Sequence, residues 1–180
     1  MPQYFLAKVD IGDKQTFGAE IETKSYLVNA VSLSDTDIRV IGALCDQGIP
    51  YENIYVYSAK EEIIEQVFNA EQFAVFRWYK VTAIFEIQND DNGQIKTSKK
   101  TYYIAADFSA PQTAIFNALY DIGEQLRGIM DTWRITKIEE TTLADVIEYD
   151  ASRKFEHLPE PLKKQAFRYQ QADVFEKVPT

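Results

Sequence analysis

The chain has 180 residues, of which 46% are hydrophobic and 26% charged, and it carries a net charge of −9. This composition excludes wholesale disorder, and no apolar run approaches the roughly 20 residues that a membrane-spanning helix needs. The acidic excess opposes non-specific binding to nucleic acid, because contacts with phosphate need clustered Lys and Arg. The N-terminus lacks the pattern of a secretory signal, and the single cysteine, Cys45, requires no oxidising compartment, so we expect a cytoplasmic protein.

The first part of the chain predicts two strands, a helix and a third strand. Apolar residues alternate with polar ones from Phe5 to Ile11, as expected for a strand with one buried face. Ser34 is the expected N-cap of the helix, because its hydroxyl can accept from a free amide of the first turn. The elements expected here are strands over 5–11, 20–28 and 53–58, a helix with Ile38, Ile41 and Cys45 on one face, and a short helix over 59–68.

The second part repeats this order of signals. Tyr79 to Ile87 alternate like a strand, and the Asn92-Gly93 pair that follows is typical of a hairpin turn. Pro111 suits the first turn of a helix, where its missing N–H costs little. The elements expected here are strands over 79–87, 95–104 and 132–137, a helix capped by Ser109 with Ile115, Leu119, Ile122 and Leu126 on one face, and a short helix over 138–147.

The repeated order indicates an internal duplication. Residues 56–68 align without gaps to residues 135–147, with apolar residues matched at five positions. Three strands and one main helix are too few to be stable alone, so we expect the copies to share a core. The predicted fold class is α+β, with two tandem β-β-α-β(-α) repeats sharing one core and an extended C-terminal arm. The predicted domains are a first unit over 1–70, a second unit over 71–150 and the arm over 151–180.

The arm differs from the body in charge and pattern. Residues 151–180 carry six basic and four acidic side chains and are therefore +2, whereas residues 1–150 are −11. A frayed terminus is one interpretation. We prefer a docking arm, because solvated tails tend to lack large apolar side chains. We expect a folded body without it, and partner contacts through Phe155, Leu162, Phe167, Tyr169 and Phe175.

Residues suited to catalysis or metal binding are few. The only histidine, His157, lies in the arm, and Cys45 lies on the apolar face of a predicted helix. The chain has no pair of cysteines or histidines for zinc and no glycine-rich phosphate loop. We therefore expect no catalytic residues, no metal and no cofactor, and an interaction or assembly protein that binds other protein chains. An enzyme of unfamiliar type is a remaining alternative.

Binding of single-stranded nucleic acid is the second hypothesis. Such proteins stack bases on exposed aromatic rings beside Lys and Arg. Residues of this kind fall on two adjacent predicted strands of the second unit, where they would form one basic, aromatic face. They are Trp78, Tyr79, Lys80, Lys99, Lys100 and Tyr102.

Three segments of the second unit resemble a known family. They are "RWYKVTAIFEI" (77–87), "GQIKTSKKTYYIAADFS" (93–109) and "WRITKIEETTLADVI" (133–147). The chain is similar over roughly residues 4–147 to a domain family of unknown function found in gut anaerobic bacteria and their phages. The resemblance implies no activity and no site residues. It does imply a phage setting, with virion assembly or phage DNA metabolism as candidates, and a location in the host cytoplasm or the virion.

Overall fold

The computed structural model has a mixed α+β fold with two four-stranded sheets and three α-helices among its described residues. Those residues are 2–16, 18–68, 76–88, 94–107, 109–126, 132–150, 152 and 155–175; the side chains of residues 87, 88, 114, 121, 122, 124–126 and 169–175 lie outside the description. The chain divides into two compact units, residues 1–62 with 143–180 and residues 63–142. In the described residues, no helix has the length and hydrophobicity needed to cross a bilayer.

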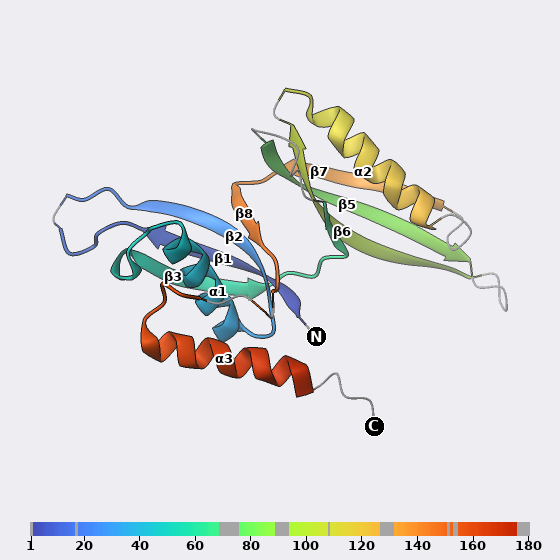
Figure 1. Ribbon diagram of the computed structural model, residues 1–180. Helices are drawn as coiled ribbons and strands as arrows, with labels where there is room; N and C mark the ends of the chain where they lie inside the picture. The colour runs from blue at the N-terminus through green and yellow to red at the C-terminus, as the bar shows by residue number, and fades with distance from the viewer. Residues whose placement is uncertain are drawn as a thin grey trace. The chain divides into compact units, whose positions relative to one another are not determined.

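The first unit is a four-stranded sheet with two helices (Figure 1). Its elements are β1 (Gln3–Ile11), β2 (Glu22–Ala30), α1 (Leu33–Asp46), a short 3-10 turn (Tyr51–Asn53), β3 (Ile54–Glu61), β8 (Leu143–Ile147) and α3 (Glu160–Phe175). The strand order is β3-β1-β2-β8. β1 is antiparallel to both β2 and β3, whereas β8 pairs in parallel with β2.

Helix α1 begins two residues earlier than expected. Ser32, not Ser34, is the N-cap, and its hydroxyl accepts from the Asp35 amide at 3.1 Å. The Asp35 carboxylate in turn accepts from the Val31 amide at 3.0 Å. The side chains of Ser32 and Asp35 therefore each accept from a backbone amide at the start of the helix, as in a capping box. The chain leaves the helix through Gly48, whose φ of +88° favours glycine.

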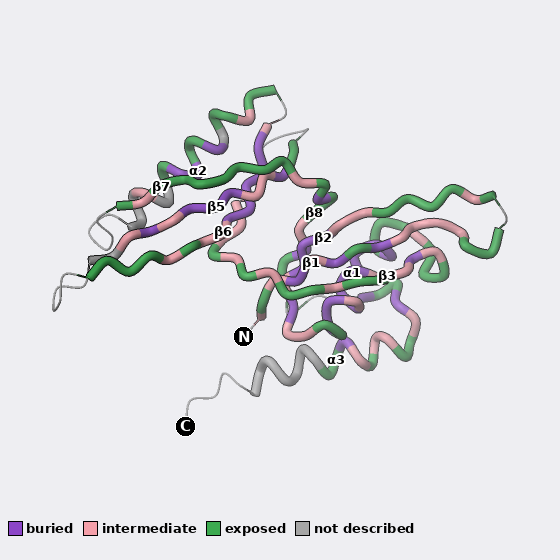
Figure 2. The backbone as a smooth tube through the Cα atoms, turned by 180° about the vertical axis from the view of Figure 1, so that it is seen from behind, coloured by how far each residue is buried: buried purple, intermediate pink, exposed green. Residues whose placement is uncertain are grey.

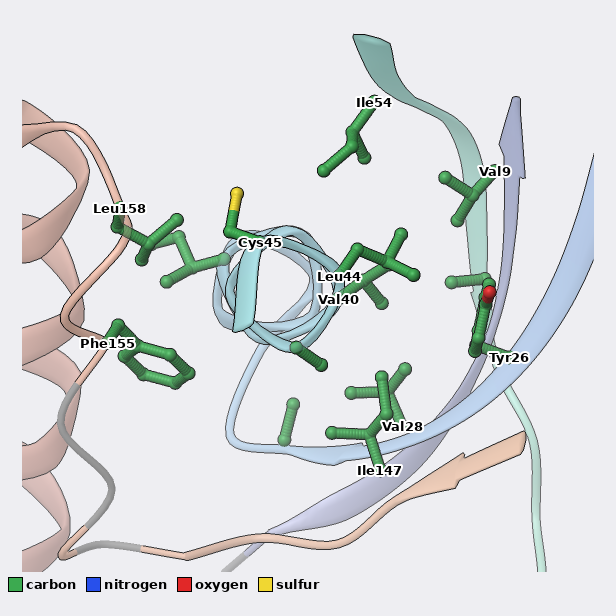
Figure 3. Packing of buried hydrophobic residues seen from close by; sticks show 14 of the residues in the cluster. Val9, Tyr26, Val28, Val40, Leu44, Cys45, Ile54, Ile147, Phe155 and Leu158 are labelled. Atoms are coloured by element: carbon green, nitrogen blue, oxygen red, sulfur yellow. The ribbon is translucent and has the colours of Figure 1, made fainter. Parts of the chain in front are cut away.

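Helix α1 is buried on two sides, whereas the sequence pattern predicted a single apolar face. Val40 and Leu44 point toward the sheet, while Phe155 and Leu158 lie on the other side of the helix (Figure 3). Both residues of the C-terminal segment are buried, with exposed fractions of 6% and 3%. The Phe155 ring lies over Gly42, where an added Cβ would be 2.3 Å from Phe155 Cδ1. The beginning of the arm is therefore part of the first unit's core.

The second unit is a sheet with one helix on it (Figure 1). Its elements are β4 (Gln66–Phe68), β5 (Phe76–Gln88), β6 (Ile95–Asp107), α2 (Pro111–Leu126) and β7 (Thr132–Glu140), in the order β4-β6-β5-β7. Alternate residues of the strands, among them Val81, Phe85 and Ile104, pack against Ile115 and Leu119 of α2. The edge strand β7 is exposed along almost its whole length (Figure 2).

Strand pairing follows one pattern in both sheets. In each, two strands form an antiparallel pair (β1–β2 and β5–β6), and the third strand (β3 or β7) is antiparallel to the first of them. A short fourth strand, β8 or β4, is parallel to the second strand of the pair. Along the chain, β4 follows β3 and β8 follows β7, so each short strand joins the sheet of the other unit.

The short helices expected over 59–68 and 138–147 are wrong. These residues belong to the ends of β3 and β7 and to the short strands β4 and β8. The cause is the spacing of apolar residues: Leu143 and Ile147 are four apart, which fits one face of a strand as well as one face of a helix. Burial follows the strand, since both residues are buried.

The units also differ from the expected domains. The boundaries 1–70, 71–150 and 151–180 do not match the compact units, because β8 and the segment 155–166 belong to the first unit. The expected single core is replaced by two buried clusters in the described residues, one in each unit. Each sheet has four strands rather than three, which supplies the burial that a shared core was expected to provide.

The packing of Phe155 on Gly42 makes a testable prediction. Replacing Phe155 by Ala should lower the free energy of unfolding by about 3–5 kcal/mol, because it leaves a cavity against α1. Gly42→Ala alone should destabilise by about 1–3 kcal/mol through overpacking. In the Phe155→Ala background, Gly42→Ala should instead be neutral or stabilising, as alanine is the better helix former. Urea unfolding of all four proteins measures this coupling, and additive effects would contradict the contact.

Candidate functional site

A pocket of about 350 Å³ lies in the first unit, between the C-terminal end of α1 and the strands β2 and β8. Five polar side chains line it, and we call it the acidic pocket: Tyr26, Asp46, Gln47, Asp145 and Glu148. The β2–β8 register places Asp145 directly opposite Tyr26, on the face of the sheet that α1 covers. The site therefore depends on the parallel pairing of β8 with β2.

The three carboxylates of the acidic pocket differ in their partners. Glu148 accepts from the Tyr4 hydroxyl at 3.0 and 3.1 Å and from Asn29 Nδ2 at 3.4 Å. Asp145 Oδ1 accepts from the Val146 amide at 2.8 Å. Within the described residues, neither Asp145 nor Glu148 is paired with Lys or Arg. Their negative charges are thus bound by neutral donors only.

Asp46 and the end of α1 add to the negative potential. Asp46 lies at the last turn of α1, where the helix dipole is negative. The imidazole Nδ1 of His157 lies 3.1 Å from Asp46 Oδ1, and its side chain is 65% exposed. The sole histidine therefore contacts the end of α1 from the beginning of the arm.

The pKa values of Tyr26 and Tyr4 are both raised by their surroundings. Tyr26 is 5% exposed, and burial, then the charges of Asp145 and Glu22, raise the pKa of its hydroxyl. Burial, followed by the charge and hydrogen bond of Glu148, raises the pKa of Tyr4 to about 12. Ionisation of these two hydroxyls is therefore disfavoured.

A buried ion pair lies in the first turns of α1. Arg39 Nε donates to Asp35 Oδ2 at 2.8 Å, and both side chains are 1% exposed. The Arg39 guanidinium also lies 4.0 Å from the centre of the Tyr149 ring, just after β8. This arrangement is structural: it ties the start of α1 to the chain segment that leaves the acidic pocket.

The five residues expected to bind a partner do not form one surface. Phe155 is buried in the core of its own unit, and Leu162 packs partly buried against the same cluster. Phe167 is 58% exposed on α3. Tyr169 and Phe175 belong to α3, but their side chains lie outside the described residues. Among the members of the set whose side chains the structure describes, Phe167 is the exposed one.

The six residues expected to bind nucleic acid fall on two faces. The β5–β6 register puts Trp78, Lys80 and Lys99 on one face of the sheet, and Tyr79, Lys100 and Tyr102 on the face that packs on α2. Both Trp78 and Tyr102 are buried, at 2% exposure. Lys100 pairs with Glu65, and the β5–β7 register sets Glu139 opposite Lys80. The expected single stacking face is not present.

Metal and nucleophile chemistry has few candidates in the described residues. No group of three or more His, Cys, Asp or Glu side chains there could hold a metal ion. Cys45 is buried, and desolvation raises the pKa of its thiol, which opposes formation of the reactive thiolate.

The Tyr4–Glu148 contact predicts a pH effect. A folded pKa near 12 against about 10 in the unfolded chain means that the stability from neutral Tyr4 is complete below pH 10 and is lost as pH rises toward 12. Glu148→Gln should lower the pKa of Tyr4, since the negative charge is lost while an amide oxygen can still accept the hydrogen bond. NMR titration of the Tyr4 ring carbon in both proteins measures this. Identical titrations would contradict the contact.

Comparison with known proteins gives one match. No curated protein and no solved structure matches the chain. A family match extends over residues 3–149, which nearly coincides with the stretch where the sequence resembled a family of unknown function. The chain therefore belongs to the family described as Domain of unknown function (DUF4494).

Proposed function

We propose that the protein is a non-enzymatic interaction or assembly protein whose helix α3 contacts a neighbouring chain. The observation that carries this proposal is the two-sided character of α3. Leu162 and Ala166 face the core of the first unit, while Phe167 is 58% exposed. Lys164 and Arg168, on either side of Phe167 in the sequence, are exposed as well.

This combination of side chains suits a protein interface. Complete burial of a Phe side chain is worth about 1.5–3 kcal/mol, which the free chain does not gain at Phe167. Aromatic residues and Arg are enriched in interfaces and among the residues that dominate binding energy. A shallow groove of about 390 Å³, lined by Pro161, Lys164, Gln165 and Arg168, offers room for partner side chains beside them.

The charge distribution supplies local complementarity between copies. The arm is +2 and the rest of the chain is −11, so the arm of one copy locally offsets the repulsion between two chains of net charge −9. In the phage setting that the family resemblance implies, such contacts would build part of a virion or an accessory assembly. The protein would then act in the host cytoplasm or the virion.

Single-stranded nucleic acid remains the alternative partner, with less support. Its candidate residues lie on opposite faces of one sheet, and two of the aromatic rings are buried. Stacking of bases needs exposed rings on one surface. Lys99 is exposed, but a single lysine supplies little affinity for phosphate.

We also propose that the two units derive from tandem β-β-α-β repeats. The shared pattern of strand pairing supports this, including the parallel fourth strand of each sheet. An alignment of family members provides the test: a profile of residues 1–70 should match one of residues 71–150, with Val56 aligned to Ile135. Profiles that match no better than shuffled sequences would contradict duplication.

The interface proposal predicts the effect of one substitution on α3. Phe167→Ser should weaken self-association by at least about tenfold, because the exposed ring contributes most of the apolar contact. Light scattering after size-exclusion chromatography over a range of concentrations measures the mass. Phe116→Ser on α2 is the matched control, since Phe116 is 69% exposed in the other unit, and it should leave the mass unchanged. A wild-type chain that stays monomeric, or equal effects of both variants, would refute the proposal.

A further inference from the structure

We infer that the acidic pocket receives Lys164 or Arg168 from α3 of a second copy of the chain. This inference rests on the proposed function, since it names the surface that α3 would contact. The pocket and the helix both belong to the first unit, so two copies can make the contact twice around a twofold axis.

The acidic pocket has the chemistry of a cation site. Asp46, Asp145 and Glu148 line it, and the negative end of α1 lies beside them. Among the described residues, no Lys or Arg neutralises Asp145 or Glu148. A volume of about 350 Å³ accommodates a side chain rather than a folded element.

Tyr26 adds a neutral polar group to the pocket. Its side chain lines the pocket and is 5% exposed, and its hydroxyl has no hydrogen-bond partner in the described part of the chain. A cationic side chain entering between Tyr26 and Asp145 would donate to both.

The complementary charges lie on α3. Lys164 and Arg168 are four residues apart and therefore on one face of the helix. Both are exposed, and neither forms an ion pair within the described residues, whereas Lys163 pairs with Glu160 at 3.4 Å. Phe167 lies on the same exposed turn, so insertion of a basic side chain would also bring its ring against the partner. Unpaired cations and unpaired carboxylates on one unit thus match each other across two copies.

Charge reversal on the full-length chain tests this. One variant carries Asp145→Lys and Glu148→Lys, and the other carries Lys164→Glu and Arg168→Glu. Each alone should associate at least about tenfold more weakly than wild type, because like charges then meet at both contacts. An equimolar mixture should regain wild-type association, since native charges meet at one contact and exchanged charges at the other. Analytical ultracentrifugation measures the three samples, and circular dichroism verifies that each variant is folded.

The outcomes separate this inference from the proposed function. If Phe167→Ser weakens association and both charge variants do not, α3 is an interface but the acidic pocket is not its receptor. If the charge variants dissociate and their mixture does not recover, the cation comes from another source, such as a polyamine or a different basic protein, and the inference is wrong. Should a reversal variant fail to fold, Asp145→Asn with Glu148→Gln and Lys164→Gln with Arg168→Gln replace it. These neutral pairs must each weaken association, and an unchanged mass contradicts the inference.

Discussion

The structure of the first unit depends on the burial of α1 between its sheet and the segment that begins at Phe155. The contact requires a residue without a side chain at position 42, because any Cβ would meet the Phe155 ring. It also shows that the C-terminal segment is part of the core and not only a docking arm. Since Phe155, Leu158 and Ala166 are buried in the core, the C-terminal segment cannot be removed without exposing apolar surface on α1. The arm is a structural element whose outer side remains available.

Local patterns were sufficient to predict most of the elements from the sequence. The alternation from Phe5 to Ile11 and the helical spacing after Pro111 correspond to β1 and α2. The same local reasoning misplaced Leu143–Ile147, because an apolar spacing of four fits both a helix and a strand. The residue pattern there contains no further signal that separates the two structures.

The acidic pocket was not predictable for a related reason. Tyr26 and Asp145 are distant in the sequence and meet only through the parallel pairing of β2 and β8. Nothing in a single sequence specifies which strand a short segment will join. The nucleic-acid hypothesis was wrong about a single face because it grouped residues that are neighbours in the sequence, such as Trp78 and Tyr79. Consecutive side chains of a strand point to opposite faces of the sheet.

Asp145 in the edge strand β8 and Glu148 just after it affect how another chain can approach this edge of the sheet. β8 is the last strand of its sheet, and exposed edges invite pairing with strands of other chains. Acidic side chains such as Asp145 and Glu148 oppose such pairing, because two copies that approach edge to edge bring like charges together. A basic helix meets no such repulsion. The carboxylates that oppose extension of the sheet are therefore complementary in charge to the basic side chains of α3 that we propose as their partners.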